Sequence, residues 1–273
     1  MSTGVIWLNK EQPNPLLPEP NRLWAVSDSL YSYNNKPSLD IGSKLFQIII
    51  NLYQKNPMTV EQPYLSLKIG YCFAGSTQAG LNTYALLCSI LCTLRVFDNN
   101  YPSLEEIADA CHRISVKHKT PIINDHIFEY SIFGFCLVHM RYECYRIRYE
   151  KTGDSMFKTI DLENEYLVIG SHCDEIKARI EKFKMDNDIN ILKYSRAPAY
   201  VVDEIIKNKV YIDIGGSLQL GITHGIQFDL YAVVHRDEED NNVVYYKFNN
   251  IDVFRDVVSV GPCMIEPHAL YLD

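Results

Sequence analysis

Apolar runs along the chain separate strand-like segments from helix-like segments. Continuous runs rich in β-branched and aromatic residues predict buried strands over residues 3–9, 22–29, 44–53 and 65–75. The segments between these runs are rich in Pro, Asn and other turn-forming residues. Four strands precede the first helix, which favours antiparallel sheets, because parallel sheets alternate strands with helices.

Helical periodicity follows the fourth strand. We predict helices over residues 77–96, from Ser103 onward, over 171–183 and over 197–209. Ser103 and Glu106 have the spacing of a capping box, in which each side chain bonds the backbone N–H of the other residue. Ser171, with Asp174 three residues later, is the predicted N-cap of the third helix.

Strand patterns return in the second half of the chain. They cover residues 126–150, with a turn near His139–Tyr142, then 165–171, and a final hairpin over 225–250. The expected fold is α+β, a four-layer αββα sandwich of two mainly antiparallel sheets flanked by helix pairs. Sheets buried on both faces would explain why the strands are apolar throughout.

Composition indicates a large globular chain. Of 273 residues, 47% are apolar, so a sizeable core can form. We expect a single domain over residues 2–273, with insertions near 10–21 and 54–64 and a C-terminal extension from about 236. The 34 acidic residues exceed the 26 basic ones, which disfavours nucleic-acid binding.

The chain also lacks the sequence features of membrane insertion and secretion. No window of about 18 uncharged apolar residues occurs, so we expect no membrane span. The first residues lack the basic and long apolar regions of a signal peptide. The 8 cysteines are scattered without a C-x-x-C pair, which favours a reduced cytoplasmic protein over a disulfide framework.

The sequence predicts no metal or cofactor. Cys88 and Cys92 share a helical face, but core packing explains them better than a metal site does. The histidines are dispersed and do not form the H-E-x-x-H motif of zinc peptidases; they include His112, His118, His126 and His139.

An acid and a base lie at the ends of two predicted core strands. Asp28 closes the second strand and Lys44 opens the third, 44 − 28 = 16 residues later. A lysine that is half buried at a strand start needs an anion beside it, and Asp28 is the candidate. The plainer alternative is that Asp28 is a turn residue and Lys44 a solvated charge at a sheet edge.

An ordered set of short motifs resembles the proteasome β-subunit group of N-terminal nucleophile hydrolases, in particular bacterial-type homologues. The segment "STGVIW" is similar to the family's start, "AVSDS" to the end of its second strand and "SKLFQI" to its lysine-led third strand. "CFAGSTQA" resembles the turn before the first helix, and "VIGS" and "YIDIGGS" resemble later motifs. The resemblance runs from Ser2 to about Val234 and implies the αββα fold of that group.

The resemblance also implies a peptidase of the threonine or serine type. Ser2, once Met1 is removed, would be the nucleophile, and its free α-amine would be the base. Lys44 would tune that amine and Asp28 would orient Lys44, while the N–H of Gly75 would meet the oxyanion. Ser171 and Asp213 would complete the hydrogen-bonded support. The substrate pocket would be lined by Tyr31, Phe46, Phe73 and Thr77.

Departures from the family pattern leave two alternatives open. Ser2 replaces the usual threonine, Leu30 an arginine and His172 a glycine, and Ser217 stands one place late. One alternative is a catalytically inactive proteasome-like scaffold or binding subunit, and the other is an amidase for small molecules. The expected partners are a peptide or protein substrate and further copies of the chain in a ring or helical homo-oligomer. The resemblance also allows an ATP-driven unfoldase.

Overall fold

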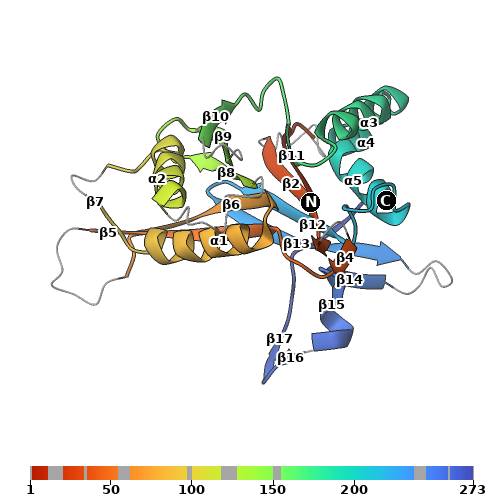
Figure 1. Ribbon diagram of the computed structural model, residues 1–273. Helices are drawn as coiled ribbons and strands as arrows, with labels where there is room; N and C mark the ends of the chain where they lie inside the picture. Colours follow the sequence, from red (N-terminus) through yellow and green to blue (C-terminus); the bar gives the residue numbers. More distant parts are fainter. Residues whose placement is uncertain are drawn as a thin grey trace.

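A computed structural model of the chain describes residues 2–11, 21–33, 36–54, 62–96, 100–117, 128–149, 155–236, 244–257 and 259–272. Much of the two predicted insertions and the tip of the predicted final hairpin lie outside the described residues. The fold is mixed α+β and is dominated by antiparallel sheets, as the element order predicts (Figure 1).

The first large sheet has the strand order β11-β1-β2-β12-β13-β14-β15, with β18 paired in parallel to β13. Its strands are β1 (Thr3–Asn9), β2 (Arg22–Asp28), β11 (Leu167–Gly170), β12 (Leu218–His224), β13 (Gln227–Arg236), β14 (Val244–Phe248), β15 (Ile251–Asp252) and β18 (Ala269–Tyr271). The antiparallel pairing of β1 with both β11 and β2 places the start of the chain inside this sheet, between two other strands.

The second large sheet has the order β10-β9-β8-β6-β5-β7. Its strands are β5 (Leu45–Gln54), β6 (Leu65–Gly75), β7 (Leu94–Val96), β8 (Phe128–Cys136), β9 (Arg141–Tyr149) and β10 (Ser155–Ile160). Two short pairs complete the strands: β3 (Tyr31–Tyr33) with β4 (Lys36–Leu39), and β16 (Ser259–Val260) with β17 (Cys263–Met264).

The helices pack on the two sheets separately. They are α1 (Thr77–Leu91), α2 (Leu104–Lys117), α3 (Cys173–Asp186), α4 (Ile191–Ser195), α5 (Ala197–Lys207) and the π-helical turn η2 (Val253–Val257). Leu87 of α1 and Ile107 of α2 belong to an apolar cluster with β5, β6, β8 and β9. Ile176 of α3 and Val202 of α5 share a cluster with β1, β2 and β12.

A third apolar cluster joins the two sheets face to face. It combines Ile6 and Leu23 of the first sheet with Cys72 and Phe133 of the second. The Phe133 and Phe228 rings meet edge to face, with 5.1 Å between their centroids. Central strands such as β1 and β6 contribute alternate residues to two of these clusters, so they are buried on both faces, as their apolar sequences require.

Most predicted elements occur at the expected places, and the capping box is confirmed. Ser103 N donates to Glu106 Oε2 at 2.8 Å, and Glu106 N donates to Ser103 Oγ at 3.1 Å. The predicted helix over 77–96 was too long, because α1 ends at Leu91 and β7 follows it. Leu94 pairs with Leu52 at the edge of β5, and this strand pairing outweighs the local helical pattern.

Ser171 is not the N-cap that the sequence predicted. His172 occupies the N-cap of α3 in a left-handed conformation with φ of 57°, and Ser171 turns back toward the start of β1. Sequence periodicity did not predict β10, α4 and β12, nor the elements that follow residue 250. The segment predicted as a plain connection over 32–43 contains the β3–β4 pair.

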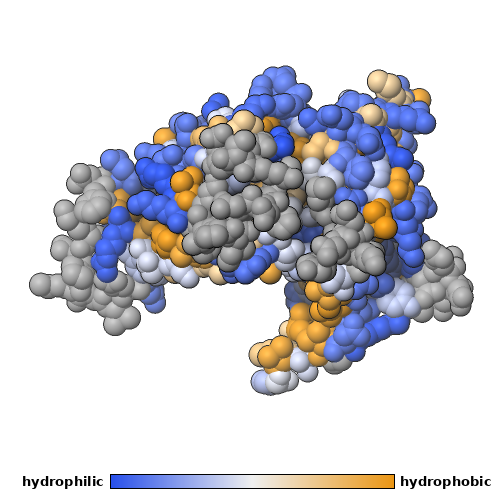
Figure 2. Space-filling model, in the orientation of Figure 1, coloured by the Kyte–Doolittle hydropathy of each residue, from blue (hydrophilic) through white to orange (hydrophobic). Residues whose placement is uncertain are grey.

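The C-terminal elements β15, η2, β16 and β17 project from the body of the molecule (Figure 1). Apolar residues gather on this projection (Figure 2). They include Phe254, Val260 and Met264, of which Met264 is 85% exposed. Within the described residues, no helix is long and apolar enough to cross a bilayer.

Candidate functional site

The two large sheets bring Asp28 and Lys44 into contact. Asp28 is the last residue of β2 in the first sheet, and Lys44 directly precedes β5 in the second. Lys44 Nζ lies 2.8 Å from Asp28 Oδ2, and the two side chains are 1% and 0% exposed. This burial excludes the alternative that Lys44 is a solvated charge at a sheet edge. The predicted acid–base pair is therefore a buried ion pair between the sheets.

Asp28 is held by further donors from separate parts of the chain. Thr3 N donates to Asp28 Oδ1 at 2.9 Å. Leu30 N and Gly215 N each donate to Oδ2 at 3.2 Å. A buried carboxylate is tolerated only when its oxygens are satisfied in this way. Asp28 consequently ties the beginning of β1 to Lys44.

Burial governs the protonation of Lys44. Loss of solvation lowers the pKa of the Lys44 ammonium below its ordinary value, although the charge and hydrogen bond of Asp28 act in the opposite direction. The Lys44 backbone is also fixed, because its N–H donates to Gln219 Oε1 at 3.0 Å. The cation is therefore a rigidly placed group at the junction of the two sheets.

Ser2 lies at the same junction, next to Ser171. Ser2 is 3% exposed. Ser171 N donates to the Ser2 carbonyl oxygen at 2.9 Å, and the Ser171 hydroxyl also donates to it at 3.4 Å. Ser171 therefore contacts the first described residue of the chain directly.

Asp213 lies close to this contact. His172 Nε2 and Asp213 Oδ1 are 3.1 Å apart. Burial by itself would raise the pKa of Asp213, but the hydrogen bond from Ser171 and the charge of His172 outweigh it, so the pKa is lowered. The His172 ring also stacks on Tyr211, with 3.9 Å between centroids. His172 thus engages the Asp213 carboxylate.

Gly75 ends β6 with a positive φ of 98° and leads into α1. Its neighbour Ala74 lies near Gly170, because a Cβ built on Gly170 would stand 3.2 Å from Ala74 Cβ. Ser76 caps α1 by accepting a hydrogen bond from Ala79 N at 3.3 Å. Gly75 therefore stands at the strand-to-helix turn where the sequence placed it, and its role as an oxyanion donor stays a prediction.

The four predicted pocket residues fall into two environments. Tyr31, Phe46 and Thr77 are half-buried, whereas Phe73 is completely buried. The Phe73 ring stacks on Phe46 and packs on Gly80 of α1, so it belongs to the core beneath that helix. Burial raises the pKa of Tyr31 to about 12, with a further contribution from the Asp28 charge.

Sequence reasoning missed two polar residues that support the site. Gln219 of β12 accepts hydrogen bonds from both Lys44 N and Leu45 N. Glu129 of β8 is 3% exposed and accepts from Gly170 N at 2.6 Å and from Arg146 Nε at 2.8 Å. The available signal in the sequence was a polar residue inside a mainly apolar strand, Gln219 in "LQLGI" and Glu129 in "FEYSIF".

At the level of the fold, the chain resembles solved structures of Anbu (ancestral beta-subunit) proteins. The chain is similar to the solved structure of Anbu (ancestral beta-subunit) from Yersinia bercovieri, with a TM-score of 0.52, 14% identity and coverage of 84% of this chain and 86% of that chain. It is also similar to a Gly-1 mutant of Anbu from Hyphomicrobium sp. strain MC1, with a TM-score of 0.50, 13% identity and coverage of 84% and 85%. At such identities the likeness shows the fold alone. The sequence matches no protein-family model and no curated protein.

Proposed function

We propose that this chain is a proteasome-like N-terminal nucleophile hydrolase that cleaves peptide or amide bonds. The observation that carries the proposal is the buried Lys44–Asp28 ion pair, with Asp28 hydrogen-bonded to Thr3 N beside Ser2. The proposal includes the four-layer αββα arrangement of that class. The helix clusters on the two sheets and the apolar cluster between the sheets support it.

In the proposed reaction the Ser2 hydroxyl attacks the substrate carbonyl and passes its proton to the α-amine of the same residue. The positive charge of Lys44 favours the neutral amine, which is the form that accepts a proton. The N–H of Gly75 stabilises the oxyanion. The α-amine, now protonated, then gives this proton to the leaving nitrogen, and water hydrolyses the acyl-enzyme. Ser171 and Asp213 orient the residue 2 backbone and its amine.

The mechanism requires Ser2 to be the first residue of the mature chain, because an acylated amine is not a base. Thr3 is a poorer candidate, since it is completely buried within β1 and its hydroxyl lies 3.5 Å from the Ile169 carbonyl oxygen. Tyr31, Phe46 and Thr77 are proposed to line the substrate pocket, with Phe73 behind them. A peptide or protein is the proposed substrate.

A peptide epoxyketone tests the proposal, because its adduct needs both a hydroxyl and the free amine of the same residue. Intact mass first establishes that Met1 is absent. The expected result is one covalent adduct in the wild type and in Thr3→Ser, and none in Ser2→Ala. Failure to label protein that has a free Ser2 amine would overturn the proposal.

The second candidate is a catalytically inactive subunit that acts as a scaffold. The contact of His172 with Asp213 favours it, because it engages a carboxylate that would otherwise support the amine. Absence of both labelling and turnover, with an intact fold, is the result that this candidate predicts. Turnover of small amides but not of peptides would instead indicate an amidase.

We also propose a homo-oligomer. The exposed apolar side chains of the C-terminal projection, such as Val260 and Met264, support it, because a contiguous apolar patch of this kind usually marks an interaction surface. Light scattering of the wild type and of Val260→Asp tests this, and the variant is expected to dissociate. An unchanged mass in the variant would exclude this surface as the interface.

A further inference from the structure

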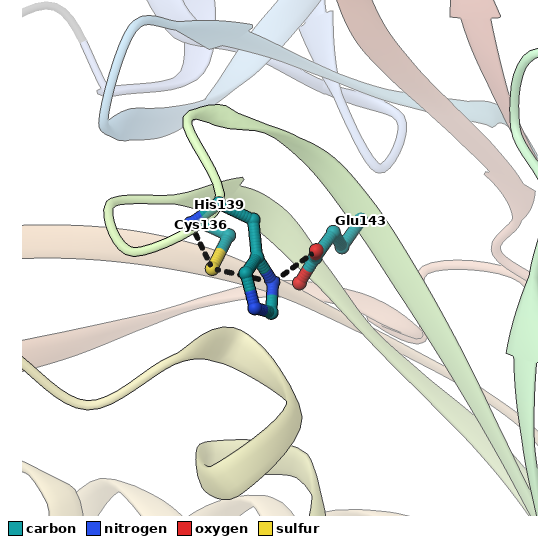
Figure 3. Close-up of side chains that lie close together, drawn as sticks. All are labelled: Cys136, His139 and Glu143. Carbon is teal, nitrogen blue, oxygen red and sulfur yellow. Dashed lines mark hydrogen bonds and ion pairs between the residues drawn. The ribbon is translucent and has the colours of Figure 1, made fainter.

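The turn between β8 and β9 brings together three side chains of different ligand chemistry (Figure 3). Cys136 ends β8, His139 lies in the turn, and Glu143 follows in β9. Cys136 Sγ lies 3.6 Å from His139 Nδ1, and the same nitrogen lies 2.7 Å from Glu143 Oε1. The three donor atoms all lie within 4.8 Å of one another.

Neighbouring groups hold Cys136 in this arrangement. The residue is 1% exposed, although its sulfur is a potential ligand. The backbone N–H groups of Leu104 and His139 each point at Cys136 Sγ from 3.4 Å. Such N–H contacts orient a sulfur ligand from outside the coordination sphere.

Glu143 is held in a similar way. It is 4% exposed, and Tyr145 OH donates to its Oε2 at 2.9 Å. This contact leaves the other oxygen, Oε1, facing His139. The hydrogen bond to Oε2 thus orients the carboxylate from outside, as is typical of a metal ligand, while Oε1 contacts His139 Nδ1 and Arg141 Nε.

We propose that Cys136 Sγ, His139 Nδ1 and Glu143 Oε1 bind one divalent ion of the zinc class. Zn–S and Zn–N bonds of about 2.3 and 2.0 Å place sulfur and nitrogen about 3.5 Å apart in a tetrahedron. The observed separation of 3.6 Å matches this edge. The nitrogen–oxygen edge would be about 3.3 Å, so the Glu143 carboxylate must withdraw by roughly half an ångström as its hydrogen bond to His139 is lost.

The donor set selects the class of metal. Calcium and magnesium prefer oxygen ligands alone, whereas thiolate and imidazole together favour zinc or a similar transition ion. Binding releases the thiol proton of Cys136 and requires an unprotonated Nδ1 on His139. His139 also lines a surface hollow of about 680 Å³, from which water can occupy the fourth position.

Arg141 would compete with a metal ion for Glu143 Oε1. Its Nε donates to Glu143 Oε1 at 3.0 Å, and its side chain is 69% exposed. A side chain so open to solvent can turn away when a cation binds. Removing the Arg141 charge should therefore strengthen metal binding, a result that a purely structural hydrogen-bonded cluster does not predict.

The metal site is separate from the proposed catalytic site. Phe128, at the other end of β8, pairs with Gly75, whereas Cys136 lies eight residues further along the strand. Eight residues of strand span about 26 Å. Metal binding by Cys136, His139 and Glu143 therefore does not depend on the proposed hydrolase activity.

Cobalt titration of the full-length chain, without a polyhistidine tag, tests the site. The expected result is a single bound Co²⁺ with a thiolate-to-cobalt absorption band. The band should be absent in Cys136→Ser and in His139→Gln, and Glu143→Gln should weaken binding at least about tenfold. His139→Gln provides the second variant because His139 is partly exposed, so its fold should survive even where Cys136→Ser does not.

Two further variants complete the design. Arg141→Gln should tighten cobalt binding about threefold or more, because a competing cation is removed. Cys263→Ser, which changes an exposed cysteine outside the cluster, should leave binding unchanged. No thiolate band in the wild type, or equal binding by folded His139→Gln, would overturn the proposal.

Discussion

Gly170 and the Ser2 carbonyl group are packed so closely that no side chain fits between them. A Cβ on Gly170 would overlap the Ser2 carbonyl oxygen, and the Gly170 backbone has a φ of 100°. Both features require glycine. Since Gly170 pairs with Thr3 across β1 and β11, this contact sets how deeply the start of the chain sits between its neighbouring strands.

Gly170→Ala should therefore destabilise the protein by about 3 kcal/mol or more, through backbone strain and displacement of Ser2. Denaturant unfolding measures the loss. Gly225→Ala is the matched control, because Gly225 also has a positive φ, 57°, but open space around it. The control should cost only about 1–2 kcal/mol. Equal losses in the two variants would show that the Ser2 contact contributes nothing.

The Lys44–Asp28 pair should behave as a buried ion pair. Lys44→Met leaves the Asp28 carboxylate buried without its cation, so the free energy of unfolding should fall by about 3–5 kcal/mol. Lys44→Met combined with Asp28→Leu should recover part of this loss, because no uncompensated charge remains. Urea unfolding of the single and double variants makes the comparison.

The Lys68–Asp229 pair is the control for that experiment, because its side chains are 29% and 17% exposed. Solvent screens such a pair, and Lys68→Met should cost about 1 kcal/mol or less. If Lys68→Met destabilised the protein as much as Lys44→Met, burial would not be the cause of the difference.

Asp213 should make stability depend on pH in acid. Its folded-state pKa lies below the ordinary value of 3.8, so the unfolded state binds the proton first as the pH falls. The stability that Asp213 contributes is present above pH 3.8 and disappears as the pH falls through the lower folded-state value. The difference in unfolding free energy between the wild type and Asp213→Asn should therefore shrink in that window.

Asp188→Asn, at an exposed residue, serves as the control for the acid experiment. Its difference from the wild type should stay small at every pH. A wild-type to Asp213→Asn difference that persisted unchanged below pH 3.8 would contradict the assignment.

Cys72 should be unreactive in the native protein. It is completely buried, and burial raises the pKa of its thiol to about 12, despite the opposing effects of Ser27 and Lys44. Iodoacetamide near pH 8 should therefore modify the exposed Cys263 and spare Cys72, because only the thiolate reacts. Peptide mapping by mass spectrometry distinguishes the two. Equal modification of both in the native state, with equal rates after unfolding, would contradict the buried position.

Local patterns predicted most of the elements that form the candidate site. Asp28 and Lys44 stand at the ends of apolar runs that are buried in the core. Buried charges of opposite sign are tolerated when they pair with each other. The Ser103–Glu106 capping box could also be predicted from the sequence, because its partners lie within one helical turn. Both kinds of signal depend on neighbours a few residues apart, or on charges that have few alternative partners.

Other features depended on contacts between distant segments. The last residues of the predicted first helix became β7 because β5 offers them a strand edge. Ser171 left its predicted capping position because the start of β1 presents a carbonyl group to it. Neither partner is visible in the local sequence.

The sequence by itself determined most of the order of strands and helices and the antiparallel character of the sheets, and it made Asp28 and Lys44 candidates for a pair, because periodicity and the ends of apolar runs are local features. Only the tertiary structure decided that Glu129 anchors Gly170 and that Cys136, His139 and Glu143 converge at one turn. The spacing of those three residues matches no common metal motif. Their convergence follows from strand register and from the packing of α2 on β8, which are set by the burial of the whole core.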